Sequence, residues 1–69
     1  MENFSFRLKA IRTENHLTQK QLADSVSLSA RQIIRYEQGI QEPTVSIASK
    51  IADYFDVSLD YLCGRTDIR

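Results

Sequence analysis

The chain of 69 residues contains one cysteine, one histidine, one proline, two glycines and no tryptophan. Cys63 has no partner for an intramolecular disulfide, so we expect it to act as a small apolar residue. Together with His16 it supplies too few ligands for a zinc site, and we expect neither a metal nor a cofactor. A chain of this length forms one small domain without an enzyme cleft of its own, so we expect no enzymatic activity.

Long apolar runs are also missing. The longest one is Tyr61–Cys63, far below the roughly 18 residues that a membrane-spanning helix needs. The first four residues include an acidic side chain and lead into no hydrophobic region of a secretory signal. The sequence therefore predicts a cytoplasmic location.

The chain has no net charge, because nine basic residues balance nine acidic ones. The two signs are separated, however: residues 1–35 carry six basic and three acidic side chains, and residues 36–69 carry three basic and six acidic ones. A net charge of zero argues against nucleic acid as a partner, whereas a basic first half argues for it. Charge alone leaves the class of partner open.

Apolar residues recur with helical spacing along nearly the whole chain. Phe4, Leu8 and Ile11 fall at i, i+4 and i+7 and predict the buried stripe of a first helix. A longer stripe follows a helix start at residues 43–44. We expect all of its members to be buried, namely Ile47, Ala48, Ile51, Tyr54 and Phe55. No segment alternates with the period of a strand, so the predicted fold class is all-α.

Capping residues divide this pattern into separate helices. Thr18 and Ser29 are each followed three residues later by a glutamine, which makes two capping boxes at predicted helix starts. Gly39 suits the left-handed position that ends a helix. A last short helix is predicted between a cap at Ser58 and a terminating Gly64.

The second and third predicted helices are separated by only three or four residues, which is the arrangement of a helix-turn-helix. In that motif the second helix enters the major groove of DNA and the first lies across the phosphate backbone. Both helices begin with free backbone N–H groups, which attract phosphate. Thr18 and Ser29 therefore suit two roles, because each starts a helix and each can also bond a phosphate oxygen.

Several short motifs occur in order along the chain: LTQKQLA at residues 17–23, LS at 28–29, YEQG at 36–39, Pro43, and VSLDYL at 57–62. Over residues 6–64 the sequence resembles the Cro/phage-repressor-type helix-turn-helix family, also described as xenobiotic-response-element-like regulators. The resemblance implies a compact five-helix lambda-repressor-like DNA-binding domain whose helices 2 and 3 form the helix-turn-helix. We expect one domain over residues 1–69, with its core at 6–64 and a polar tail at 65–69.

The resemblance also implies roles for individual residues. Gln19 is implied to hold a phosphate and brace the recognition helix, and Arg12 is implied to pair with Glu37 as part of the scaffold. Lys20 can contact phosphate or be an ordinary surface lysine, and Gln32 can read a base or serve only its capping box. Arginine can read guanine, glutamine can read adenine, and a methyl group can touch thymine. The predicted DNA-binding residues are Thr18, Gln19, Lys20, Ser29, Ala30, Arg31, Gln32 and Arg35.

The chain departs from the family pattern at several positions. Ser27 and His16 stand where glycine is common, so a left-handed backbone at Ser27 would be strained. Residues 40–42 carry no positive charge where the family usually has lysine or arginine, which weakens one contact to phosphate. Ile34 is expected to point away from the core and to be exposed, where it can meet thymine methyl groups or another protein.

Taken together, the sequence predicts a sequence-specific transcriptional regulator. We expect a repressor that binds a two-fold symmetric operator in double-stranded DNA through the major groove, as a homodimer. An alternative is a protein-interaction module, such as an antitoxin or antirepressor, that uses the same fold to hold a protein partner. The neutral net charge, the lack of basic residues at 40–42 and the position of Ile34 favour this alternative.

Overall fold

The computed structural model describes residues 3–69. These residues contain five helices and no strand. The predicted all-α fold class is confirmed. None of these helices is long and apolar enough to span a lipid bilayer. In chain order the helices are α1 (Phe4–Glu14), α2 (Gln19–Ser25), α3 (Ala30–Gln38), α4 (Val45–Phe55) and α5 (Leu59–Leu62).

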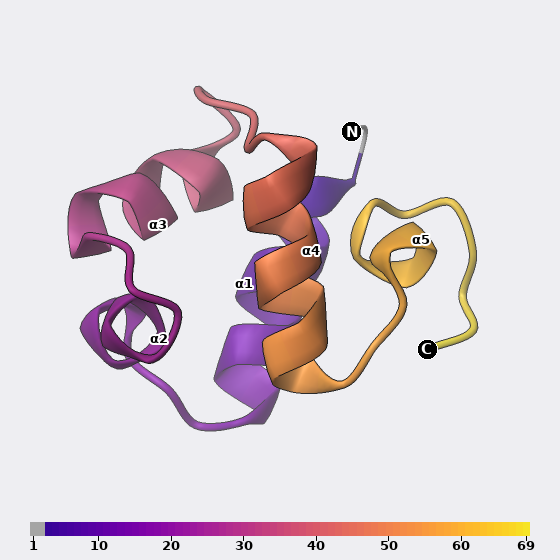
Figure 1. Ribbon diagram of the computed structural model, residues 1–69, viewed down its shortest axis with the longest axis horizontal. Coiled ribbons are helices and arrows are strands. Elements are labelled where there is room, and N and C mark those ends of the chain that lie inside the picture. Colours follow the sequence, from indigo (N-terminus) through magenta and orange to yellow (C-terminus); the bar gives the residue numbers. More distant parts are fainter. Residues whose placement is uncertain (1–2) are drawn as a thin grey trace.

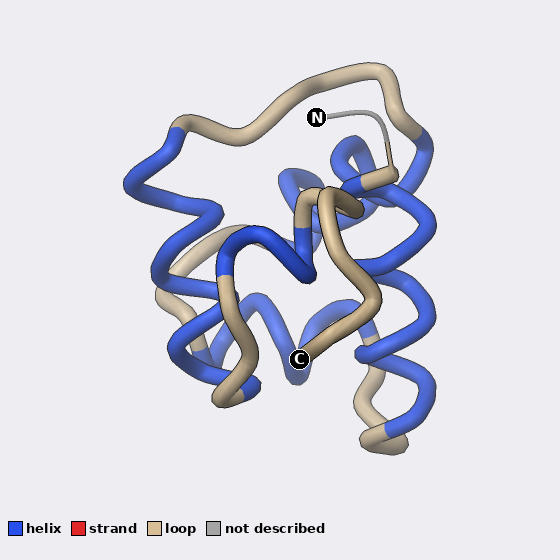
Figure 2. The backbone as a smooth tube through the Cα atoms, turned by 90° about the vertical axis from the view of Figure 1, so that its right-hand side faces the viewer, coloured by secondary structure: helices blue, strands red, loops and turns tan. Residues whose placement is uncertain are grey.

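The helices form two groups that share α1. α3 packs against both α2 and α1, whereas α5 packs against both α4 and α1. In Figure 1 the pair α2–α3 accordingly lies on one side of the molecule, and α5 with the C-terminus lies on the other. Figure 2 shows that the segment after α5 turns back over the helices and does not extend away from them. The helix-turn-helix is therefore held by α1 and lies away from the C-terminal segment.

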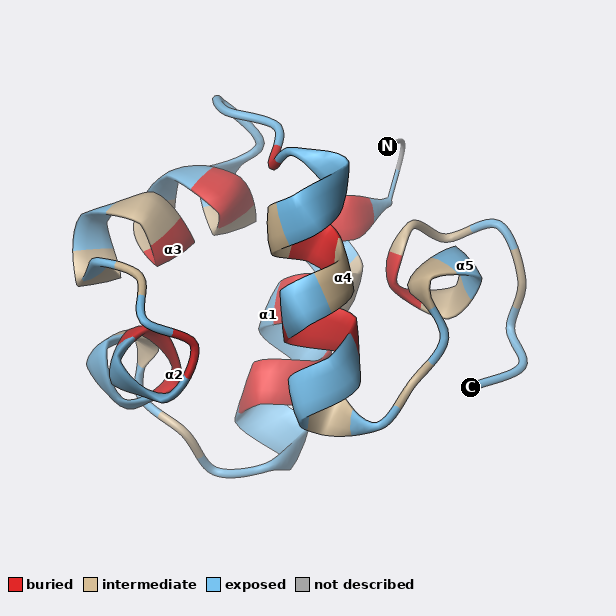
Figure 3. Cartoon of the chain, in the orientation of Figure 1, coloured by how far each residue is buried: buried red, intermediate tan, exposed pale blue. Residues whose placement is uncertain are grey.

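The core takes side chains from every helix. The predicted stripe of Phe4, Leu8 and Ile11 is confirmed, because all three are buried on the inner face of α1. Phe4 meets Tyr36 of α3 edge-on, with ring centroids 6.1 Å apart. Figure 3 shows buried segments on the inner sides of the helices and exposed ones outside. The buried apolar residues are Phe4, Leu8, Ile11, Leu22, Ala23, Val26, Ile33, Tyr36, Ala48, Ile51, Ala52 and Leu62.

The predicted stripe on α4 is partly wrong. Ala48 and Ile51 are buried as predicted. Ile47 and Phe55 are half-buried against the core, but Tyr54 is 44% exposed. Ala52, which lies outside the predicted stripe, is 2% exposed. Successive helical residues are rotated by about 100° around the axis, so the inner face of α4 is centred near Ala48 and Phe55. Tyr54 therefore lies at the edge of that face. The local spacing alone did not indicate how far this edge of α4 is covered.

The predicted caps are present. The side chains of Thr18, Ser29 and Ser58 each accept a hydrogen bond from the backbone N–H three residues later, and the first two complete their capping boxes. Gly39 ends α3 with a φ of 74°, and Gly64 follows α5 with a φ of 80°. The caps satisfy N–H groups that have no partner inside the helix, and this local chemistry sets the helix boundaries.

The polar C-terminal tail folds back onto α1 and α5. Asp67 accepts a hydrogen bond from Arg7 at 2.6 Å. Arg69 pairs with Glu14, at the opposite end of α1, at 2.7 Å, and this hydrogen bond raises the pKa of Arg69 above its ordinary value. The guanidinium carbons of Arg7 and Arg69 lie 4.2 and 5.3 Å from the ring centroid of Tyr61. These contacts tie the last residues to the two helices.

Candidate nucleic-acid interface

A tight turn joins α2 to α3, as expected for a helix-turn-helix. Ser27 in this turn has a φ of 58°, and His16 in the turn before α2 has the same value. The N–H of Leu28 donates to the carbonyl of Ala23 at 2.8 Å, and Val26 is buried beneath the turn. A left-handed conformation is strained for residues other than glycine, so packing around both turns must hold it in place.

The start of α2 faces solvent. Thr18 is exposed, its Oγ1 accepts from the N–H of Gln21 at 3.0 Å, and its own N–H donates to the Gln21 side chain at 2.8 Å. Lys20 Nζ lies 3.4 Å from Asp24, and the two side chains are 77% and 66% exposed. Such an exposed pair is weak and screened by salt, so it leaves Lys20 accessible to a phosphate.

The start of α3 is closed by a second capping box. The N–H of Ser29 donates to Oε1 of Gln32 at 3.0 Å, and the N–H of Gln32 donates to Ser29 Oγ at 3.1 Å. Reading adenine requires both the oxygen and the nitrogen of a glutamine amide, and the cap already engages the oxygen. Of the two roles left open for Gln32, the geometry favours capping.

The outer face of α3 presents two arginines. Ile33 and Tyr36 are buried on the inner face, and Ala30 is half-buried against the core. Arg31 and Arg35 lie one turn apart and are both exposed. Neither guanidinium forms an ion pair with any residue in the range 3–69. α3 therefore carries two available charged donors on the side opposite the core.

Ile34 corrects one expectation, because it is half-buried and not exposed. It lies at the edge of the outer face of α3, between Arg31 and Arg35 on one side and Glu37 on the other. Gln38 is also exposed on this face, although the predicted set does not include it. Its spacing of seven residues from Arg31 is the sequence signal that identifies it.

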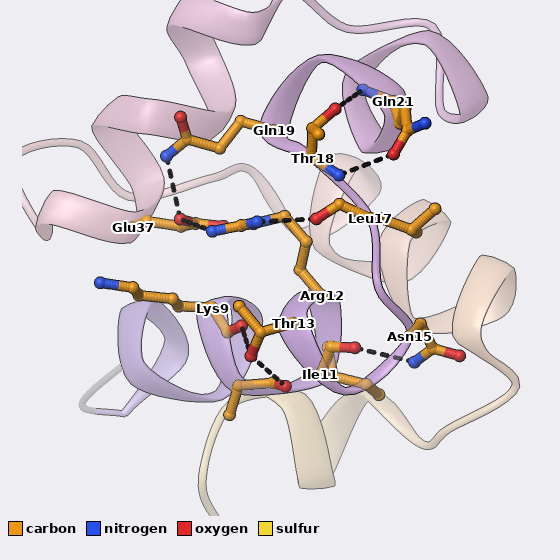
Figure 4. A network of polar contacts seen from close by, with 11 residues as sticks. Lys9, Ile11, Arg12, Thr13, Asn15, Leu17, Thr18, Gln19, Gln21 and Glu37 are labelled. Carbon is orange, nitrogen blue, oxygen red and sulfur yellow. Dashed lines mark hydrogen bonds and ion pairs between the residues drawn. The ribbon is translucent and has the colours of Figure 1, made fainter.

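Arg12 and Glu37 form the pair that the family resemblance implies. Arg12 Nε donates to Glu37 Oε2 at 2.6 Å, and Nη2 donates to Oε1 at 3.0 Å (Figure 4). Arg12 Nη1 also donates to the carbonyl of Leu17 at 2.8 Å. The two charged side chains are only 11% and 4% exposed. The hydrogen bond to Glu37 raises the pKa of Arg12 above its ordinary value, because it favours the charged guanidinium.

Gln19 joins this network from the first turn of α2. Its Nε2 donates to Oε1 of Glu37 at 3.1 Å, and Figure 4 shows its amide oxygen pointing away from that carboxylate. One carboxylate on α3 thus bonds side chains from α1 and α2. This hydrogen bond matches the bracing that the resemblance implies for Gln19, and it uses only one of the two amide hydrogens of Gln19.

Comparison with known proteins agrees with this geometry. The sequence model of the family described as helix-turn-helix matches residues 8–62. The chain therefore belongs to the helix-turn-helix family, of the Cro/phage-repressor type that its motifs resemble. The match covers the helix-turn-helix itself and both halves of the Arg12–Glu37 pair.

Individual relatives are named as transcriptional regulators. The chain is 41% identical over 59 residues to the cryptic phage CTXphi transcriptional repressor RstR of Vibrio cholerae, covering 86% of this chain and 53% of that protein. It is 37% identical over 54 residues to the uncharacterized HTH-type transcriptional regulator MJ0272 of Methanocaldococcus jannaschii, covering 78% of this chain and 82% of that protein. The chain is thus similar to the helix-turn-helix part of proteins that are named as transcriptional regulators.

A solved structure shares the fold. The crystal structure of a transcriptional regulator from Listeria innocua matches with a TM-score of 0.79 at 27% identity, over 86% of this chain and 55% of the other. The chain spans about half the length of several curated relatives that it matches, RstR among them. The likeness therefore concerns the helix-turn-helix part of those proteins.

Proposed function

We propose that this chain is the DNA-reading domain of a transcriptional repressor and that it places α3 in the major groove of an operator. The observation that carries the proposal is the exposure of Arg31 and Arg35, one turn apart and without ion-pair partners in the described part of the chain. A guanidinium can donate two hydrogen bonds to O6 and N7 of one guanine. Two such groups on one helix face suit two base positions of a half-site.

Contacts to phosphate would come from the helix starts and the first turn of α2. Thr18 and Ser29 lie where backbone N–H groups and the helix dipole favour an anion. Gln19 has one amide hydrogen to spare, and Lys20 is exposed. Such contacts carry no sequence information, but they would hold the duplex in register while α3 reads the bases.

A two-fold symmetric operator requires two copies of the domain. We propose that the protein binds as a homodimer to half-sites about 10–10.5 base pairs apart, one turn of DNA. Occupation of the operator would block polymerase. The Vibrio cholerae relative is named as a repressor, which supports this sign of regulation.

The test is a titration against duplexes selected from a random oligonucleotide pool. Arg31→Ala and Arg35→Ala should each weaken specific binding about 5- to 150-fold per half-site and relax the preference at one base position of each half-site, because each removes one bidentate contact per subunit. The matched control is Lys50→Ala, which removes an exposed positive charge from α4 and should bind as the wild type does. Unchanged affinity and base preference in both arginine variants would show that α3 is not the recognition helix.

The second candidate is the protein-interaction module. It is favoured by the zero net charge, by the absence of a basic residue at 40–42 and by Ile40, which is 69% exposed just after α3. Under this function the domain would shift no DNA even at low salt, and it would co-purify with a tightly bound protein partner. The DNA selection at low salt therefore separates the two candidates.

A further inference from the structure

The outer flank of α3 carries two parallel rows of side chains. Arg31 and Arg35 form a charged row, spaced by one helical turn. Ala30 and Ile34 form an apolar row with the same spacing, rotated by about 100° around the helix axis. A duplex that meets the arginines would also meet the edge on which the apolar row lies.

Ile34 is not explained by the core. The inner face of α3 is occupied by Ile33 and Tyr36, which are 0% and 1% exposed. Ala30 is half-buried and packs against the core. Ile34 is not among the half-buried apolar residues that pack against the core formed by residues 3–69. A half-buried isoleucine with no core role, beside two accessible arginines, suits contact with an apolar group of the ligand.

We propose that Ile34 reads the 5-methyl group of a thymine in the operator half-site, beside guanines that Arg31 and Arg35 read. This inference rests on the proposed DNA-binding function and adds which base the flank of α3 recognises. In the major groove the 5-methyl group is the apolar mark that identifies thymine. The side chain of Ile34 is branched at Cβ and has few rotamers, so little conformational entropy is lost on contact.

The size of the effect follows from the burial of one methyl group, which corresponds to about a fourfold change in affinity. An arginine–guanine contact is larger, at about 5- to 150-fold. Ile34 thus adjusts the preference among sites that share the guanines, and it does not supply most of the binding free energy.

The experiment uses a half-site selected by the wild-type protein from a random duplex pool. Each thymine is replaced singly by deoxyuridine, which keeps the hydrogen-bonding edge and removes only the 5-methyl group. One replacement should weaken wild-type binding about fourfold. Ile34→Ala should bind the thymine and uracil duplexes equally. Ile40→Ala, the same side-chain change at an exposed position outside α3, should keep the preference for thymine.

Two results would overturn the inference: wild-type protein that binds every uracil duplex as well as the thymine duplex, or Ile34→Ala protein that keeps the preference. Thermal unfolding shows whether Ile34→Ala is folded; if it is not, Ile34→Val replaces it and should show a preference smaller than that of the wild type. If no duplex is selected, the proposed function fails and the inference fails with it. If the protein selects a duplex but binds the thymine and uracil versions equally, this inference is refuted and the proposed function stands.

Discussion

Arg12 and Glu37 lie 25 positions apart in the sequence, yet Nε of the first and Oε2 of the second are 2.6 Å apart and almost enclosed. The pair joins α1 to the last turn of α3, and Gln19 adds α2 to the same carboxylate. The angle between α2 and α3 decides whether one can lie on phosphates while the other enters the groove. Under the proposed function, the network would act on DNA recognition through the scaffold, because it fixes how α1, α2 and α3 are placed relative to one another.

Glu37→Ala should strongly destabilise the domain. The variant leaves the guanidinium of Arg12 nearly enclosed without its counter-charge, and we expect the free energy of unfolding to fall by about 3 kcal/mol or more. The control is Asp24→Ala, which breaks the exposed pair with Lys20 and should cost less than about 1 kcal/mol. Urea denaturation followed by circular dichroism measures both. Similar small losses would mean that the pair between α1 and α3 is dispensable.

Gly64→Ala should destabilise more than Gly39→Ala. Both glycines have positive φ, so a side chain at either costs about 1–2 kcal/mol. A Cβ on Gly39 would lie 3.7 Å from the nearest atom, Ser5 Oγ, whereas a Cβ on Gly64 would lie 2.5 Å from the Cβ of Asn3. The second variant therefore adds a clash between the two ends of the chain. Thermal unfolding gives the order of the two midpoints.

The clash itself can be tested separately. Adding Asn3→Gly to Gly64→Ala removes the opposing Cβ and should recover part of the lost stability, whereas Asn3→Gly added to Gly39→Ala should recover none. No recovery in the first combination would assign the whole cost to the backbone conformation.

Ser27→Gly should stabilise the domain by about 1 kcal/mol, because glycine relieves the left-handed strain at φ 58° and loses only part of that gain to backbone entropy. The matched control is Ser49→Gly, the same change inside α4, which should destabilise by about 0.5 kcal/mol. Opposite signs in denaturant titrations are the expected result. A loss of stability in both variants would show that the turn between α2 and α3 gains nothing from glycine.

Lys20→Ala tests the phosphate contact at the start of α2. If Lys20 neutralises one phosphate, the slope of log K against log salt concentration should become shallower by about 0.9 per subunit. Affinity should fall by a similar factor on every sequence, because a phosphate contact is not base-specific. Lys50→Ala should leave the slope as it is. An unchanged slope for Lys20→Ala would identify Lys20 as an ordinary surface residue.

Much of the fold follows from short-range patterns. The capping boxes at Thr18 and Ser29 and the glycine at position 39 place helix ends where the structure has them, because a cap involves residues only three or four positions apart. The positive φ at Ser27 follows from the tightness of the turn. The exposed face of the candidate site is predicted in the same way, because helical spacing places Arg31 and Arg35 on the side of the helix opposite the buried Ile33 and Tyr36.

Other features depend on which elements meet. Helical spacing placed Tyr54 in the core, but Tyr54 is 44% exposed at the edge of α4, and Ala52 is buried instead. It also predicted an exposed Ile34, whereas in the structure this side chain is half-buried. The pair of Arg12 and Glu37 was suggested by the family resemblance and not by spacing.

The sequence by itself determined the helices, their ends and the face that each turns inward, because these depend on hydrogen bonds and periodicity within a few residues. Only the tertiary structure decided how far each edge of a face is covered. It also brought together charges far apart in the chain, such as Arg7 with Asp67 and Glu14 with Arg69, 60 and 55 positions away. Such pairs form only after the helices have packed, and no local pattern encodes which surfaces will then be adjacent.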